Sequence, residues 1–248
     1  LAAEHLRLGT WDLLCAWTGC DARGVEPRLA MQLVHESALC MSRVRKGQSL
    51  SQKGFEVANG LPFVATDQAI HALLEAQTVQ STKHLQIALG RLRRASGHFS
   101  GRLLAVDPHH LRSWTKRQTR RHRHKETEKP FKSLQTFFSL DAETCQPVAF
   151  TIASAAKTVS QATPELLDMT RAILNPDPEK PPLVLADNEH LTAEIFEYVN
   201  APGSPFDLLC PMPRGQAAQK KTAALPDELF KPRWAGMATA RQPYQFQN

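Results

Sequence analysis

Two aspartates are the residues of this chain best suited to chemistry. Asp107 follows the apolar run 102–106, and Asp187 follows the apolar run 183–186. If the two runs form neighbouring parallel strands, both carboxylates emerge at the same edge of a sheet, where ligands of such sheets collect. Close carboxylates repel each other unless a cation lies between them, and their hard oxygens suit Mg²⁺ or Mn²⁺. The pair therefore predicts a divalent-metal site.

The chemistry that such a site performs best is phosphodiester cleavage. Two ions about 3.5–4 Å apart can activate a water and stabilise the leaving oxygen, so we expect Asp107 and Asp187 to be both metal ligands and catalytic residues. The alternative is that each aspartate is a helix cap or a turn residue, and for either one alone this alternative is the stronger. Asp187 is well placed to cap a following helix. Together, in this strand order and beside a basic segment, they favour the metal.

The basic segment lies between the two aspartates. Residues 112–132 hold nine Lys and Arg against two acids, whereas the other 227 residues hold 21 against 22, within a chain of net charge +6. A local excess of this kind is typical of a polyanion site, and the alternative is a solvated loop. Contacts to phosphates would position DNA without reading its sequence. The expected contacts are Arg112, Lys116, Arg117, Arg120, Arg121, Arg123 and Lys125.

The elements that must position these residues fall into two halves. Residues 1–98 are predicted to be helical, with apolar spacing over 6–17, 28–45, 67–74 and 81–94. The cations at the end of the last helix suit its dipole, and a DNA-binding helical bundle explains them equally well. These cations are Arg91, Arg93 and Arg94.

The second half predicts three antiparallel strands, then helix, strand, helix and strand in an α/β fold with a mixed sheet. The antiparallel strands are expected over 102–106 (stopped by Asp107 and Pro108), 133–140 and 147–153, with a hairpin turn at 141–146. The later elements are expected over 164–174, 183–186, 191–199 and 206–210. Beyond Pro211 no clear periodicity remains, which indicates a loop or an insertion.

Four segments in this order resemble insertion-sequence transposases of the Asp-Asp-Glu type. They are Leu103–His109, Leu134–Asp141, Ala149–Ser154 and Leu183–His190, and the resemblance covers about residues 103–213. It implies a ribonuclease-H-like core whose first two metal ligands are Asp107 and Asp187. It further implies Mg²⁺-dependent hydrolysis at the ends of a mobile element, followed by attack of the freed 3′-hydroxyl on target DNA.

The resemblance also implies a domain order and a set of partners. Residues 1–98 would bind the element's terminal repeats, 99–213 would form the catalytic core, and 214–248 would begin an insertion. The partners would be the terminal repeats and target DNA, and whether the active form is a homodimer on DNA is left open. Two other interpretations remain: a catalytically incomplete DNA-binding remnant, and a ribonuclease-H-like nuclease that never joins strands.

The family's third ligand, a glutamate, has no convincing match. Glu228 is the best placed by distance, but its surroundings allow barely one turn between prolines. Glu189 is too near Asp187 to match, although it and His109 could act as accessory residues. Because the chain begins at Leu1 rather than Met, we expect a piece of a longer protein, with the third carboxylate beyond Asn248.

Composition and sequence motifs exclude several classes of protein. With 42% hydrophobic and 22% charged residues, a disordered or fibrous chain is excluded. No apolar run reaches the 18 or more residues of a membrane span, and no signal-peptide pattern opens the chain. No sequence motif of an organic cofactor is present. We expect a cytoplasmic, nucleoid-associated bacterial protein.

The five cysteines are an odd number without a CxxC pair, which favours a reducing compartment over a disulfide framework. A zinc site could be assembled from Cys15, Cys20, His35 and Cys40, but their spacing fits no familiar finger. Small buried thiols are common, so we expect no metal there.

Overall fold

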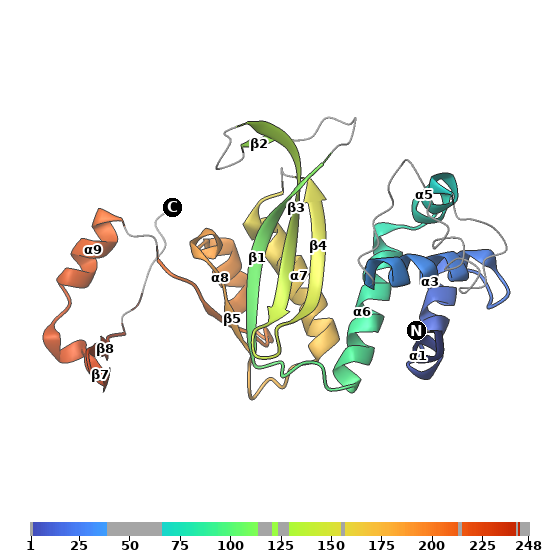
Figure 1. The fold of residues 1–248 in the computed structure, drawn as a ribbon. Helices are drawn as coiled ribbons and strands as arrows, with labels where there is room; N and C mark the ends of the chain where they lie inside the picture. The colour runs from blue at the N-terminus through green and yellow to red at the C-terminus, as the bar shows by residue number, and fades with distance from the viewer. Residues whose placement is uncertain are drawn as a thin grey trace. The chain divides into compact units, whose positions relative to one another are not determined.

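The computed structural model describes residues 2–38, 66–113, 121–123, 129–154, 157–212, 215–241 and 243 (Figure 1). Its contacts divide the chain into two compact units. One unit comprises Leu1–Phe99 and Met169–Asn175, and the other comprises Ser100–Asp168 and Pro176–Asn248. Among the described residues, no helix is both long enough and apolar enough to cross a membrane.

The first unit is helical. Its N-terminal helices are α1 (Ala2–Arg7), α2 (Thr10–Thr18), α3 (Val25–Ala38), α5 (Asp67–Glu75) and α6 (Val79–Ala95). Its core gathers Leu14, Leu29, Met31 and Leu73, because the apolar positions of α2, α3 and α5 recur at helical spacing. The predicted helix after Thr66 is confirmed, with Thr66 accepting a hydrogen bond from Ala69 N. α3 begins three residues before the predicted position 28, and residues 39–45 of that prediction lie outside the described residues.

Arginines of α6 bind the last turn of another helix, α7 (Val159–Leu174). Arg91 Nε donates to Ala172 O at 2.8 Å, and Arg94 Nη1 donates to Leu174 O at 2.9 Å. Free carbonyls at a helix end attract cations. Arg93 lies over the Phe99 ring, 4.7 Å from its centroid. The structure therefore gives these three arginines packing roles within the unit.

Gly90 allows α6 to approach the same turn of α7. A Cβ added to Gly90 would lie 2.7 Å from atoms of the Ile173 side chain, which is fully buried. No β-carbon is tolerated at that distance unless the neighbour moves, so a glycine is required here for close packing.

Gly90→Ala is expected to destabilise the protein by about 1–2 kcal/mol, because overpacking a core outweighs the gain in helix propensity. The measurement is urea unfolding followed by circular dichroism. Trimming the opposing side chain with Ile173→Val in the same molecule should recover part of the loss. Strictly additive effects of the two substitutions would contradict the close contact.

The second unit is built on a mixed sheet, which confirms the predicted α/β class. The strands are β1 (Leu103–Arg112), β2 (Arg121–Arg123), β3 (Pro130–Asp141), β4 (Gln146–Ser154), β5 (Leu183–Leu185) and β6 (Asp207–Leu209). Their order is β2-β3-β1-β5-β6, and β4 pairs with β3 outside this path (Figure 1). β1, β3 and β4 are antiparallel neighbours, whereas β1, β5 and β6 run parallel. Buried Leu104, Val106 and Val184 alternate with more exposed neighbours.

The prediction that β1 stops at Asp107 and Pro108 is wrong, since the strand continues to Arg112. Leu103 and Ser113 both hydrogen-bond toward β3, and because backbone groups alternate sides along a strand, Pro108 falls on the opposite side. On that side β5 has already ended at Leu185, opposite the third residue of β1. The missing N–H of Pro108 therefore removes no ladder bond.

The later helices and strands follow the predicted order with shifted bounds. α7 begins at Val159, five residues before Pro164, which lies inside the helix. A short 3-10 helix, η1 (Asn188–His190), precedes α8 (Ala193–Asn200). The region after Pro211 is not irregular throughout, since it contains α9 (Gln216–Ala223), η2 (Asp227–Leu229) and the hairpin strands β7 (Lys231–Trp234) and β8 (Met237–Thr239).

The predicted turn between β3 and β4 is confirmed and depends on Asp141, which is fully buried. Its carboxylate accepts hydrogen bonds from Gly101 N at 2.8 Å and Thr144 N at 3.0 Å. Glu143 N and Ser100 Oγ donate to it as well, each at 3.2 Å. One side chain thereby fixes both the entrance to β1 and the β3–β4 turn.

Candidate functional site

The structure places Asp107 on β1 and Asp187 two residues beyond the end of its parallel neighbour β5. Leu103 pairs with Leu183 and Ala105 with Leu185, so each aspartate stands four residues beyond the first paired position of its segment. Asp107 is exposed in the middle of β1, at the level where β5 has ended. Parallel neighbours carry corresponding residues on the same face of a sheet. The two carboxylates therefore share one end of the β1–β5 pair.

Asp187 is held by hydrogen bonds that begin η1. Its Oδ1 accepts from Glu189 N at 3.0 Å and from His190 Nδ1 at 2.8 Å. The Asp187 side chain is 43% exposed, whereas that of His190 is only 1% exposed. The capping role considered as the alternative is therefore real. Both hydrogen bonds are to Oδ1. Within the described part of the chain, Oδ2 accepts no hydrogen bond.

Asp107 experiences the negative charge of its neighbour. Partial desolvation raises the pKa of the Asp107 carboxyl, and repulsion from Asp187 raises it further. His190 and His109 oppose this shift and lower the pKa. The Asp107 carboxylate accepts no hydrogen bond from the described residues. The repulsion from Asp187 is therefore not offset by a donor, and a bound cation would relieve it.

The accessory candidates do not complete a triad. Among the described residues, no three His, Cys, Asp or Glu side chains form a group that could hold a metal ion. Glu189 is exposed and donates its backbone N–H to Asp187, while Glu228 is exposed on η2. His109 is exposed on β1, and its carbonyl accepts a hydrogen bond from Thr136 Oγ1.

The two aspartates nevertheless fit a magnesium-type ion. Mg²⁺ is commonly held by one or two carboxylates, with waters and substrate phosphates completing its shell. Asp107 and Oδ2 of Asp187 offer hard oxygens of this kind, and their mutual repulsion favours a cation between them.

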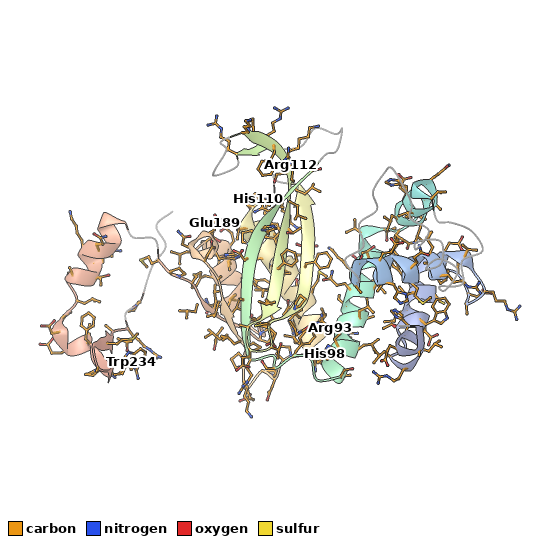
Figure 2. The ribbon with its side chains drawn as sticks, in the orientation of Figure 1. Arg93, His98, His110, Arg112, Glu189 and Trp234 are labelled. Atoms are coloured by element: carbon orange, nitrogen blue, oxygen red, sulfur yellow. The ribbon has the colours of Figure 1, made fainter. Side chains whose placement is uncertain are left out.

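Part of the basic segment lies on strands of the same sheet. β2 pairs with β3 so that Arg121 is opposite Lys132 and Arg123 is opposite Pro130. Arg121 and Arg123 are two residues apart, so they project from the same face of β2, and both are exposed. Figure 2 shows Arg112 at the end of β1 that approaches β2, with His110 on the same strand and Glu189 on η1, near α8. Lys116, Arg117, Arg120 and Lys125 lie outside the described residues.

Two residues near the pair were not found from the sequence. His190 contacts Asp187 directly, and the only signal was its place three residues after a capping aspartate. Cys210 follows β6, and burial together with the charge of Asp187 raises the pKa of its thiol. Of the residues considered for a zinc site and judged not to form one, Cys15 and Cys20 are free thiols, and Cys40 lies outside the described residues.

No protein-family model matches the chain, and no curated protein matches it. Among solved structures it is similar to a Mos1 mariner paired end complex with Mn, at 11% identity and a TM-score of 0.30 over 74% of this chain and 66% of that chain. It is also similar to a Mos1 transposase paired-end complex with left transposon end, at 13% identity and a TM-score of 0.30, covering 80% and 72% of the two chains.

A pre-cleavage Mos1 transpososome is similar at 13% identity and a TM-score of 0.31, over 78% of this chain and 64% of that chain. The chain thus spans 66%, 72% and 64% of the length of these three neighbours. TM-scores near 0.3 at these identities establish neither a shared fold nor a shared function.

Proposed function

We propose that this chain holds the catalytic core of a transposase of the Asp-Asp-Glu type, which hydrolyses phosphodiester bonds at the ends of a mobile element and joins them to target DNA. The observation that supports the proposal is the corresponding placement of Asp107, on β1, and Asp187, just beyond the end of the parallel neighbour β5. The exposed cations of β2 on the same sheet add a surface for phosphates.

The proposed ligands are Asp107 and Asp187, and the proposed cofactor is a pair of Mg²⁺ or Mn²⁺ ions. When bound, such ions supply an activated water and stabilise the charge on the leaving oxygen. The protein's part is to hold the two carboxylates at one sheet end against their repulsion. The arginines of β2 hold the phosphate backbone, which orients the scissile bond without reading the sequence.

The proposed domains follow the same assignment. Residues 1–98 bind the element's terminal repeats, residues 99–213 form a ribonuclease-H-like core, and residues 214–248 begin an insertion. This division is close to, but not the same as, the compact units, because Met169–Asn175, which comprises the end of α7 and the residue after it, groups with the helical unit.

The proposal is tested with supercoiled plasmid DNA incubated with the purified chain in Mn²⁺, Mg²⁺ or EDTA. We expect nicking that requires the divalent ion and is lost in Asp107→Asn. Nicking that persists in EDTA, or at an equal rate in Asp107→Asn, would contradict the metal site. The products are also analysed for joined strands, because cleavage without joining indicates a nuclease instead of a transposase.

A second candidate function is a DNA-binding remnant without catalysis. It is favoured by the absence of a three-residue metal group among the described residues. Salt-sensitive DNA binding without any divalent-dependent cleavage would support it.

Replacing both Arg121 and Arg123 with Gln is expected to weaken binding to all DNA sequences alike. Each lost phosphate contact lowers the slope of log affinity against log salt by about 1, so the pair lowers it by about 2. The measurement is fluorescence anisotropy of a labelled duplex between low and moderate salt.

The matched control changes the same charge elsewhere. Arg102 and Lys180 precede β1 and β5, at the opposite end of the parallel pair. Arg102 pairs with Glu143 at 2.8 Å, an exposed bridge of little energetic weight. Gln at both of these positions should leave the salt slope unchanged. If the two double variants lost the same amount of DNA affinity and salt slope, binding would depend on net charge alone.

A further inference from the structure

The contact between Asp187 and His190 exceeds what a cap requires. An N-cap side chain normally accepts one backbone hydrogen bond at the helix start, and Glu189 N already supplies it at 3.0 Å. The His190 ring adds a second donor to the same oxygen, at 2.8 Å. Because Asp187 accepts, the ring nitrogen that donates is Nδ1–H, which fixes the tautomer of a neutral ring.

The ring is itself held in place. His190 N donates to Asp187 O at 3.2 Å, and His190 O accepts from Thr192 N at 2.9 Å. Thr192 then caps α8 through its hydroxyl. With only 1% of its side chain exposed, His190 is locked by packing, whereas the Asp187 carboxylate that it contacts remains 43% exposed. A buried donor thus orients an exposed acceptor.

These hydrogen bonds give the two carboxylate oxygens of Asp187 different roles. Two donors on Oδ1 restrict rotation of the carboxylate, and Oδ2 accepts no hydrogen bond from the described residues. The carboxylate of Asp107, in contrast, accepts no hydrogen bond from the described residues. The position of the carboxylate pair therefore depends on Asp187, and His190 lies near enough to Asp107 to influence its charge as well.

We infer that His190 is a positioning residue, which holds Oδ1 of Asp187 through Nδ1–H so that Oδ2 is presented to the divalent cation. The inference rests on the proposed function and adds to it a residue that touches neither metal nor DNA. Partners of this kind, one step removed from the ion, typically change metal affinity 10–100-fold when they are removed.

The test measures Mn²⁺ binding to the full chain by electron paramagnetic resonance of the free ion, beside plasmid cleavage. His190→Leu fills the buried space but has no donor. His190→Gln keeps a polar amide but places it near the Nε2 position, whereas His190→Asn places its amide nitrogen near the position of Nδ1. We expect Leu and Gln to weaken Mn²⁺ binding about 10–100-fold, and Asn to remain within about threefold of the parent because it retains the donor.

A merely structural role for His190 predicts a different pattern. His190→Asn would then bind Mn²⁺ as weakly as His190→Gln. The loss of Mn²⁺ affinity would follow the loss of thermal stability rather than the absence of a hydrogen-bond donor. That result, or parent-like Mn²⁺ binding by His190→Leu, overturns the inference. The proposed function stands in both cases if Asp187→Asn abolishes Mn²⁺ binding and cleavage. A parent chain that neither binds Mn²⁺ nor cleaves DNA overturns the proposed function, and this inference with it.

Discussion

Asp187→Asn is expected to reduce metal-dependent cleavage about 10³-fold or more, since it removes several kcal/mol of charge stabilisation in the transition state. Fold and DNA binding should survive. The amide oxygen of asparagine can still accept from Glu189 N and His190 Nδ1, which in the parent are 3.0 and 2.8 Å from Oδ1. The measurement combines single-turnover cleavage of supercoiled plasmid with anisotropy of a labelled duplex.

The matched variant is Asp187→Ala, which removes charge and cap together. It should lose cleavage to the same extent. It should also lose about 1 kcal/mol of stability for the N-cap and about 1–3 kcal/mol more for the buried ring N–H of His190 left without an acceptor. Thermal unfolding of both variants separates the two effects. Cleavage by Asp187→Asn at the parent rate would remove Asp187 from the site.

Asp141→Ala is expected to destabilise the second unit by about 3 kcal/mol or more, because buried donors left without a partner cost 1–3 kcal/mol each and are not fully additive. Three backbone N–H groups, of Gly101, Glu143 and Thr144, donate to this carboxylate. Against a typical domain stability of about 5–15 kcal/mol, the loss is large. Urea unfolding at neutral pH measures it.

The control is Glu143→Gln in the same turn. Glu143 forms an exposed ion pair with Arg102, and such pairs contribute about 0–1 kcal/mol. A loss from Glu143→Gln comparable to that from Asp141→Ala would show that the turn as a whole, rather than the buried carboxylate, is sensitive.

The same carboxylate makes stability depend on pH. Burial by itself would raise the pKa of Asp141, but hydrogen bonds from Gly101, Thr144 and Ser100 lower it below the ordinary value of 3.8. A lowered pKa in the folded state adds stability above the unfolded pKa, and this stability disappears as the pH falls through the folded pKa. The difference in the free energy of unfolding between the parent and Asp141→Asn should therefore become smaller below about pH 4.

Sequence reasoning could predict the mixed α/β sheet because apolar runs and helical spacing are local signals. It could not predict that β1 passes through Pro108, since that depends on which neighbour faces the missing N–H. Likewise, Arg91 and Arg94 could be interpreted as phosphate contacts or as helix ends until the carbonyls of α7 were seen beside them.

The candidate site likewise contains residues that the sequence could reveal and one that it could not. Asp107 and Asp187 could be singled out because each follows an apolar run, a feature visible in the chain itself. His190 could not, because a buried histidine and a surface histidine look alike in a sequence, and its role depends on a turn that brings it back to residue 187. The helix and hairpin after residue 214 lack a strong apolar period. Residues 219–223 of α9 and all of β7 are exposed, so no buried face requires such a period.

The uninterrupted passage of β1 through Pro108 has a geometric consequence. Asp107 and Arg112 belong to one strand, five residues apart, and at 3.2–3.4 Å per residue they are separated by about 17 Å along it. Side chains alternate between the two faces of a strand, so this odd separation places Asp107 and Arg112 on opposite faces of the sheet. Arg121 and Arg123 pair with Lys132 and Pro130 of β3, each an even number of residues from Phe138, the β3 partner of Asp107. These two arginines therefore share the face of Asp107, and in the proposed complex β2, rather than the end of β1, would hold the DNA backbone.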